Sequence, residues 1–213
     1  MLEKLPESLG HALQGQRSGI EQILLRHLMS AREVPYFKVN SSAFENMGAI
    51  PVQYTADGEG LSPPIAWQGV PEATARVVLI VEDADSPTPH PLVHAIVVAG
   101  GGDGSIGSGE LPSGNGEGAH AVVGLNSYLQ HRWLPPDPPP GHGVHRYVFQ
   151  LFALRDEMKF SQSLGRRELA EAVLASAIGA GCLIGTYERI KTQDVRASAM
   201  SAGDEVPASA TPA

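Results

Sequence analysis

The sequence predicts a single, mainly β domain with helices added near its ends. Several apolar and β-branched segments have the length of a strand, and stretches rich in Gly, Pro, Asn and Asp separate them. Apolar residues at helical spacing occur near the two ends of the chain, within residues 1–35 and over residues 166–178. Many strands and few helices, joined by turn-rich links, indicate a mainly β architecture.

Composition limits the classes of partner and the cellular compartment. The chain has 213 residues, 42% of them hydrophobic, so it can bury one substantial core. Its formal net charge is −8 and it has no cluster of Lys or Arg, which argues against nucleic acid and acidic membrane surfaces as partners. A single cysteine, Cys182, excludes an internal disulfide and fits a reducing compartment. With no signal-peptide pattern and no apolar run of transmembrane length, a cytoplasmic protein is expected.

Residues 1–35 are expected to form an amphipathic helical extension. The stretch from Ser18 to Glu21 matches a capping box, in which two side chains bond backbone N–H groups at the start of a helix. Apolar residues recur at helical spacing at Ile20, Ile23, Leu24 and Leu28. Pro35 is expected to end the helix. Because its polar face mixes charges of both signs, we expect this helix to pack on the domain or on a second copy of the protein, and not on a membrane surface. Packing on a second copy would make a homodimer, which is the expected assembly.

Strands are expected from residue 37 onward. A first strand covers residues 37–39, and a later segment places Ile65 and Trp67 on one face of a strand. Residues 77–81, Val-Val-Leu-Ile-Val, suit a central strand that is buried on both faces. Residues 94–98 predict another buried strand, which begins with a polar side chain.

A Gly-rich stretch over residues 100–118 is expected to be a flexible surface loop. It lacks the Lys and Ser/Thr arrangement of a phosphate-binding P-loop. A short strand over residues 121–124 and a loop over residues 126–133 follow.

The last predicted elements are a helix over residues 166–178 and a strand over residues 182–187. Gly179–Gly181 is expected to stop the helix. The helix residues expected to point inward are Leu169, Val173 and Leu174. Because residues 192–213 contain few large apolar groups, they are expected to be a disordered tail, which leaves residues 36–191 as the folded domain.

The most informative stretch runs from Pro135 to Leu154 and joins a proline run, a glycine loop and a strand. The prolines lack backbone donors and hold the chain extended, while Gly141 and Gly143 allow tight turns. The strand that follows places Tyr147, Phe149 and Leu151 on one face and Val148, Gln150 and Phe152 on the other. His145 and Tyr147 therefore point to the same side, beside the glycine loop.

Polar side chains gather at the ends of three predicted strands. Asp83 and Asp85 follow the first buried strand, His94 opens the second, and His145 and Tyr147 open the third. Two interpretations are possible for these residues: a ligand site at the edge of the sheet, or local hydrogen bonds and turn capping.

These motifs together resemble the phosphatidylethanolamine-binding protein family, and most closely its bacterial, Raf-kinase-inhibitor-like branch. The resemblance rests on ED-x-D-x-P, on a His before an apolar strand, on PPPGHGxHRYxFxLFAL and on a late GTYER, over roughly residues 36–190. It implies a β-sandwich with a large central antiparallel sheet, a smaller sheet and peripheral helices. It also implies a pocket for phosphate-like anions. The ligand-binding residues carried over are Asp83, Asp85, His94, Gly141, His142, Gly143, His145 and Tyr147.

The sequence departs from the family pattern at several of these positions. Ala84 and Ser86 replace the usual Pro and Ala beside the two acids, and the aromatic neighbour usual for the strand-opening His is missing around His94. Cysteines common in the bacterial branch are replaced by Ala56 and Asp137. The added negative charge of Asp137 is expected to weaken the binding of dianions.

The resemblance favours a protein that binds a small anionic ligand and regulates or inhibits a partner kinase or protease. No catalytic residue, cofactor or metal is predicted. The alternative is an enzyme that uses the same Asp, His and Tyr groups for general acid and base chemistry. A metal site is disfavoured because structural zinc ligands are usually closer in sequence and rich in Cys. A third hypothesis is an interaction module whose N-terminal helix makes a homodimer.

Overall fold

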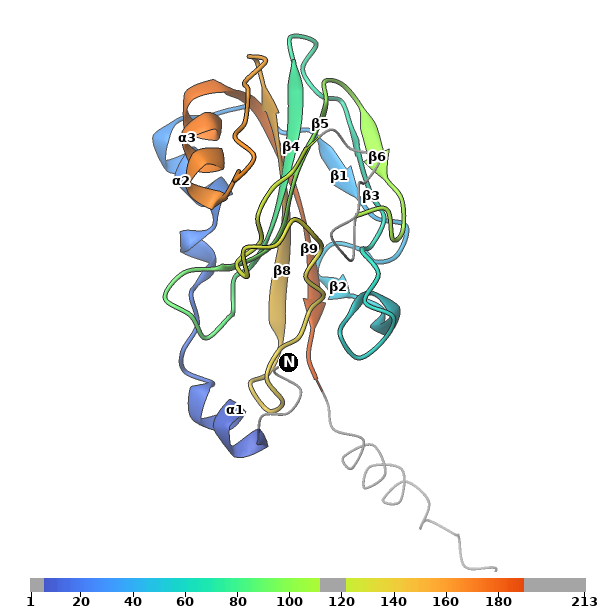
Figure 1. Ribbon diagram of the computed structural model, residues 1–213, viewed down its shortest axis with the longest axis vertical. Helices are drawn as coiled ribbons and strands as arrows, with labels where there is room; N and C mark the ends of the chain where they lie inside the picture. Colours follow the sequence, from blue (N-terminus) through green and yellow to red (C-terminus); the bar gives the residue numbers. More distant parts are fainter. Residues whose placement is uncertain (1–5, 112–121, 190–213) are drawn as a thin grey trace, which may run out of the picture.

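The structure is a computed structural model and describes residues 6–111 and 122–189 (Figure 1). The predicted tail over residues 192–213 and part of the Gly-rich loop lie outside the described residues.

Two β-sheets form the body of the protein. The larger sheet has six strands in the order β2-β9-β8-β4-β5-β7, and the smaller has three in the order β1-β3-β6. All neighbouring strands are antiparallel except β2 and β9, which are parallel. The strands are β1 Lys38–Asn40, β2 Gly48–Ala49, β3 Ile65–Gln68, β4 Arg76–Asp83, β5 Leu92–Gly100, β6 Gly104–Ile106, β7 Val122–Val123, β8 His145–Leu154 and β9 Ala177–Tyr187. The predicted mainly β sandwich is confirmed.

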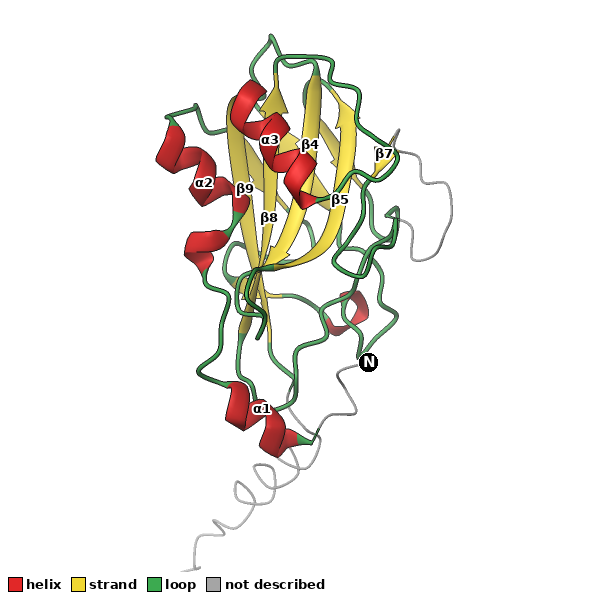
Figure 2. Cartoon of the chain, turned by 60° about the vertical axis from the view of Figure 1, so that its left-hand side comes forward, coloured by secondary structure: helices red, strands yellow, loops and turns green. Residues whose placement is uncertain are grey.

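The large sheet is buried on both faces, as predicted from its central strands. On β4, Val78 and Ile80 belong to one apolar cluster while Leu79 and Val81 belong to the other. The helices α2 (Leu24–Ala31) and α3 (Arg166–Ser176) cover one face (Figure 2), and the small sheet packs on the opposite face (Figure 1). The side chains of β8 alternate between the two clusters as expected, with Gln150 as a buried polar exception.

The N-terminal segment differs from the predicted single helix. It forms α1 (Glu7–Leu13), a 3-10 turn η2 (Ile20–Gln22) and α2, which ends before Pro35. No capping box forms, because the Ser18 hydroxyl bonds Ser86 Oγ at 3.2 Å instead of the helix. The start of α2 is capped from across the fold, where Leu24 N–H donates to Glu82 Oε2 at 2.8 Å. The helix boundaries are thus set by contacts distant in sequence.

Helix α2 packs on this chain's own core. Leu24, Leu25 and Leu28 are buried within the cluster beneath α3. Two polar side chains of the sheet hold its first turn, since Leu25 N–H donates to Gln150 Oε1 at 2.7 Å and Glu82 accepts from Leu24. Packing on the domain is thus one of the two arrangements expected for this helix, and packing on a second copy stays a prediction.

The C-terminal half also departs from the prediction in its details. Helix α3 ends at Ser176, and β9 begins at the next residue and includes Gly179–Gly181, which were predicted to be a helix stop. The glycine at 181 allows close approach of another segment, because a Cβ there would lie 2.6 Å from the Phe37 carbonyl oxygen. Leu174 is 42% exposed, contrary to expectation, while Leu169 and Val173 point inward as predicted.

Two smaller corrections concern other parts of the sheets. The stretch predicted as a flexible loop contains β6, which pairs with β3. Strand β5 begins at Leu92, so His94 lies within the strand and does not open it. Cys182 lies in β9 opposite Gln150, and burial raises the pKa of its thiol, which lowers its reactivity.

Candidate ligand-binding site

A pocket of about 270 Å³ lies at one edge of the large sheet, where β4 ends and β5 and β8 begin. The antiparallel pairing of β4 with both neighbours brings these three strand ends together, with Asp83 opposite both Leu92 and Tyr147. The polar residues that line the pocket are Asp83, Ser86, Thr88, His94, Asp137 and His145. The apolar lining is Pro87, Leu92, Tyr128, Leu134, Pro135, Pro138 and Pro139. The structure therefore brings together three of the predicted site residues, Asp83, His94 and His145.

The proline run and its neighbours supply the hydrophobic wall of this pocket. The sequence lacks the aromatic residue usual beside His94, but the Trp133 ring lies 6.1 Å from the His94 ring between centroids. Asp137 lines the pocket with its carboxylate 2.7 Å from Arg189 Nη1. Because this arginine pairs with it, the charge of Asp137 is largely compensated within the protein.

His94 is buried at the base of the pocket with only one ring nitrogen satisfied. Its Nδ1 lies 2.6 Å from the carbonyl oxygen of Leu134. Its Nε2 is buried and has no hydrogen-bond partner among the described residues. Burial lowers the pKa of His94, and this effect outweighs the opposing influence of Asp83. The side chain is therefore neutral at pH 7 and offers one unused polar atom.

Tyr147 lies directly beside His94 and is fully buried. The two rings meet edge to face with centroids 5.1 Å apart. The Tyr147 hydroxyl oxygen is also buried without a partner in the described part of the chain. Burial, reinforced by the negative charge of Asp83, raises the pKa of Tyr147 well above 10.0, so the hydroxyl stays protonated and can donate.

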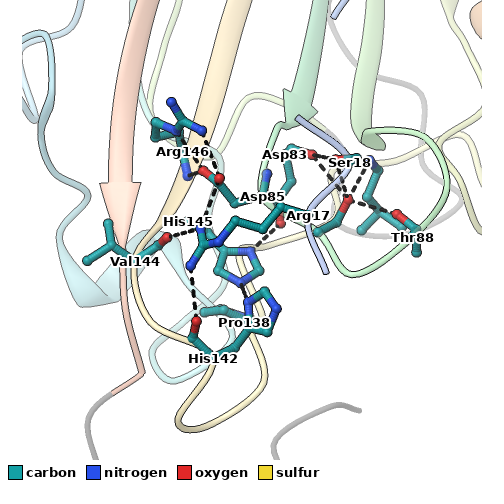
Figure 3. Close-up of polar contacts among 12 residues, drawn as sticks. Arg17, Ser18, Asp83, Asp85, Thr88, Pro138, His142, Val144, His145 and Arg146 are labelled. Atoms are coloured by element: carbon teal, nitrogen blue, oxygen red, sulfur yellow. Dashed lines mark hydrogen bonds and ion pairs between the residues drawn. The ribbon is translucent and has the colours of Figure 1, made fainter. Parts of the chain in front are cut away.

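Asp83 and His145, which line the pocket, form a hydrogen-bonded chain with His142, which does not (Figure 3). Asp83 Oδ2 lies 2.8 Å from His145 Nδ1, and His145 Nε2 lies 2.6 Å from His142 Nδ1. His142 Nε2 in turn lies 2.8 Å from the carbonyl oxygen of Leu13. Both ring nitrogens of His145 are thus engaged with protein groups, so His145 contributes to the pocket mainly by its position on the lining.

The donor and acceptor roles along this chain follow from its two ends. The Leu13 carbonyl can only accept, so His142 Nε2 carries a hydrogen. Burial and then the neighbouring His145 lower the pKa of His142. At the other end of the chain the Asp83 carboxylate also only accepts, so His145 Nδ1 carries a hydrogen and donates to Asp83. A single hydrogen then lies between His145 Nε2 and His142 Nδ1.

The glycine loop lies behind the pocket and not on its lining. Gly141 and Gly143 have φ values of 76° and 91°, which permit the tight turns expected from the sequence. Residues 13–18, which we call the N-terminal strap, cover this loop. Gln14 Nε2 donates to Gly141 O at 2.7 Å, and Arg17 Nη1 donates to Val144 O at 2.8 Å. The strap thus fixes the loop that carries His142.

Asp85 is also held away from the pocket lining, in a clamp of two arginines (Figure 3). Its carboxylate lies 2.9 Å from Arg17 Nη1 and 2.7 Å from Arg146 Nε. Burial alone would raise its pKa, but hydrogen bonds from Arg146 and Arg17 outweigh burial and lower it to about 2. Asp85 therefore joins the strap to β8.

Ser86 and Arg17, which the sequence did not assign to the site, both contribute to it. Ser86, at a position where the family usually has Ala, lines the pocket and bonds Thr88 Oγ1 at 2.8 Å and Ser18 Oγ at 3.2 Å. Arg17 bonds both the clamp and the loop. The departure from the family pattern at Ser86 was the one signal in the sequence. Arg17 left no such signal, because its partners Asp85, His142 and Val144 are more than 60 residues away in sequence.

In the described residues, no group of three or more His, Cys, Asp and Glu is placed to hold a metal ion. A helix of a length and apolarity that would span a bilayer is also absent from this part of the chain.

Comparison with known proteins identifies relatives over the same region. The family model described as phosphatidylethanolamine-binding protein matches residues 40–188. A UPF0098 protein of Methanothermobacter thermautotrophicus is 33% identical over 156 residues, which are 71% of this chain and 98% of that protein. A UPF0098 protein of Mycobacterium tuberculosis is 35% identical over 151 residues, 70% of this chain and 69% of that protein. LppC of the same species, named as a candidate lipoprotein, is 32% identical over 151 residues, 70% of this chain and 71% of that protein.

Solved structures agree with these matches. A crystal structure of a phosphatidylethanolamine-binding protein homologue from Chlamydia trachomatis superposes with a TM-score of 0.64 at 30% identity, covering 73% of this chain and 99% of the other. Escherichia coli YbcL superposes with a TM-score of 0.67 at 23% identity, covering 72% and 99%, which supports the fold alone.

Proposed function

This chain belongs to the phosphatidylethanolamine-binding protein family, and we propose that its pocket binds a small oxyanion of the phosphate or phospholipid-head-group type. Family membership supports a ligand-binding protein, and the nature of the ligand is our proposal.

The observation that carries the proposal is the pair of unpartnered polar atoms, His94 Nε2 and the Tyr147 hydroxyl. A buried polar group without a hydrogen bond costs about 1–3 kcal/mol, so a ligand that bonds both atoms would gain from their pairing. The mixed lining, apolar on the proline side and polar at Asp83 and His94, is typical of sites that hold a small polar group at the base.

The hydrogen-bonded chain of Asp83, His145 and His142 supports the same proposal. It fixes the orientation of Asp83 and His145, which both line the pocket. Because Arg189 compensates Asp137, an oxyanion would meet a site of low net charge. We therefore expect moderate affinity that depends on hydrogen bonds more than on charge.

Calorimetric titration of inorganic phosphate and phosphoethanolamine into the full chain tests the proposal. Wild type should bind saturably, His94→Ala should lose at least about tenfold in affinity, and Tyr147→Phe should lose about threefold to tenfold, the equivalent of a hydrogen bond. His27→Gln, at an exposed histidine, is the matched control and should bind like wild type. Equal affinities of wild type and His94→Ala would refute this assignment.

One observation favours a second candidate, an enzyme with His94 as general base. A neutral imidazole with a free lone pair, beside a tyrosine that can donate, is the arrangement that proton abstraction needs. Turnover of nitrophenyl esters or phosphates by wild type, abolished in His94→Gln while ligand binding persists, would favour this candidate. Saturable binding without turnover would favour the binding protein.

The cytoplasmic location, the homodimer and the regulation of a kinase or protease stay predictions. Because LppC is named as a candidate lipoprotein, cell fractionation is the direct test of location. Light scattering on the full chain tests the dimer. Inhibition assays against kinases and proteases of the source cell, with His94→Ala as the control, test regulation.

A further inference from the structure

The backbone fixes the hydrogen-bonding role of His94. Its Nδ1 lies 2.6 Å from the carbonyl oxygen of Leu134, and Leu134 N–H in turn donates to the His94 carbonyl at 2.9 Å. Because a carbonyl oxygen only accepts, the ring hydrogen lies on Nδ1. A neutral imidazole has a single N–H, so the unpartnered Nε2 is a lone-pair acceptor.

Burial keeps His94 neutral despite the carboxylates that face it. Asp83 approaches from β4 with its carboxylate already paired to His145, and Tyr147 approaches from β8 with a protonated hydroxyl. Asp137 approaches from the proline run, paired to Arg189. Burial lowers the pKa of His94 more than Asp83 and Asp137 raise it, and the neighbouring His145 acts in the same direction as burial.

A second acceptor lies in the same pocket. The Asp83 carboxylate lines it, accepts from Asp85 N–H at 2.9 Å and from His145 at 2.8 Å, and has no hydrogen to donate. A fully ionised oxyanion is likewise an acceptor only. Placed against His94 Nε2 and Asp83, such an ion would leave lone pairs facing lone pairs, which is unfavourable in a buried site.

The inference that follows rests on the proposed function. We propose that the pocket binds its oxyanion in a hydrogen-bearing form, with the O–H of a singly protonated phosphoryl group donating to Nε2 of His94. The other oxygens of the ligand remain available to the Tyr147 hydroxyl as acceptors. The pocket therefore prefers oxyanions that carry an O–H over oxyanions that are fully ionised.

This selection has two measurable consequences. Sulfate has the size and shape of phosphate but carries no hydrogen at neutral pH, so it should bind at least about tenfold more weakly, the equivalent of about 1.4 kcal/mol. A phosphomonoester loses its last hydrogen with a pKa of about 6. Above that pH its affinity should fall about tenfold for each pH unit, because the hydrogen-bearing form becomes tenfold rarer.

The test is parallel calorimetry of sulfate, inorganic phosphate and phosphoethanolamine on the full chain between pH 6.5 and 8.5. His94→Gln is the informative variant, because its amide can rotate to present either N–H or C=O to the ligand. The ratio of phosphate to sulfate affinity should fall from at least about tenfold in wild type to about one in His94→Gln. His27→Gln, on the exposed surface, should keep the wild-type ratio. If His94→Gln does not fold, the ratio of phosphate to sulfate affinity in the wild type tests the inference by itself.

The outcomes separate this inference from the proposed function. Phosphate binding with weak sulfate binding supports both. Equal affinities for sulfate and phosphate would show that His94 supplies the hydrogen of the bond. That result would overturn the proposed preference for hydrogen-bearing ligands, while the proposal of an oxyanion-binding pocket would stand. Absence of binding by all three ligands would overturn the proposed function, and the inference with it.

Discussion

Replacing Asp85 by Asn should reveal how strongly the arginine clamp holds the strap to the domain. The carboxylate is 1% exposed and paired to Arg17 and Arg146, each 33% exposed. Its pKa is about 2, against an ordinary value of 3.8. At about 1.4 kcal/mol for each pKa unit, that difference corresponds to about 2.4 kcal/mol of stability at pH 7.

Two physical considerations set the expected size and sign. Solvent screens the two partly exposed arginines, which reduces the expected loss of stability in Asp85→Asn to about 1–2 kcal/mol at pH 7. A carboxylate whose pKa is lowered by folding stabilises the protein above pH 3.8, and this stabilisation disappears as the pH falls through about 2. At pH 3, about half of the difference between wild type and variant should remain.

Urea unfolding of both proteins at pH 7 and pH 3 measures these differences. Glu59→Gln, which removes an exposed carboxylate, is the control and should change stability by less than about 0.5 kcal/mol. A loss in Asp85→Asn that is as large at pH 3 as at pH 7 would refute the reasoning, since it would show that the charge of Asp85 is not the source.

Two further predictions concern packing. Glu82→Ala should cost about 3–5 kcal/mol in urea unfolding, because it leaves Arg166, Gln150 and the first turn of α2 without their buried acceptor; a loss below about 1 kcal/mol would contradict the capping role. Gly181→Ala should cost about 1–3 kcal/mol in thermal unfolding, because the new Cβ would lie 2.6 Å from a backbone oxygen. Gly15→Ala, where nothing lies within 4 Å, is its control, and equal losses in the two variants would argue against the close-approach explanation.

The strands were predictable because their signal is local. Alternation at a period of two assigned Tyr147 and Val148 to opposite faces of β8, and the structure places them in the two different clusters. The family motifs located the pocket edge, since they carry the residues at the ends of β4, β5 and β8.

The N-terminal elements were not predictable in detail because their boundaries depend on distant partners. The start of α2 is fixed by Glu82, which is 58 residues away from Leu24, so the local capping pattern at Ser18 was misleading. The glycine pattern at Gly181 was misleading in the same way. It was predicted to stop a helix, but in the structure this glycine lies in a strand and allows Phe37 to approach closely.

Within the site, the sequence identified the residue types but not their hydrogen-bond partners. It predicted His145 as a direct ligand group, whereas both of its nitrogens bond protein atoms. His142 takes its role from the strap carbonyl of Leu13, a contact between segments 129 residues apart. Contacts between segments so far apart produce no periodic pattern of residues that a sequence-based prediction could use.

The most direct test of the account is a long-range proton–nitrogen NMR spectrum of the histidine rings during phosphate titration. Free His94 should be neutral with its hydrogen on Nδ1, and phosphate should shift its Nε2 resonance saturably as that nitrogen accepts a hydrogen bond. An unchanged His94 resonance at phosphate concentrations that saturate the calorimetric signal would contradict the account, because the anion would then bind elsewhere.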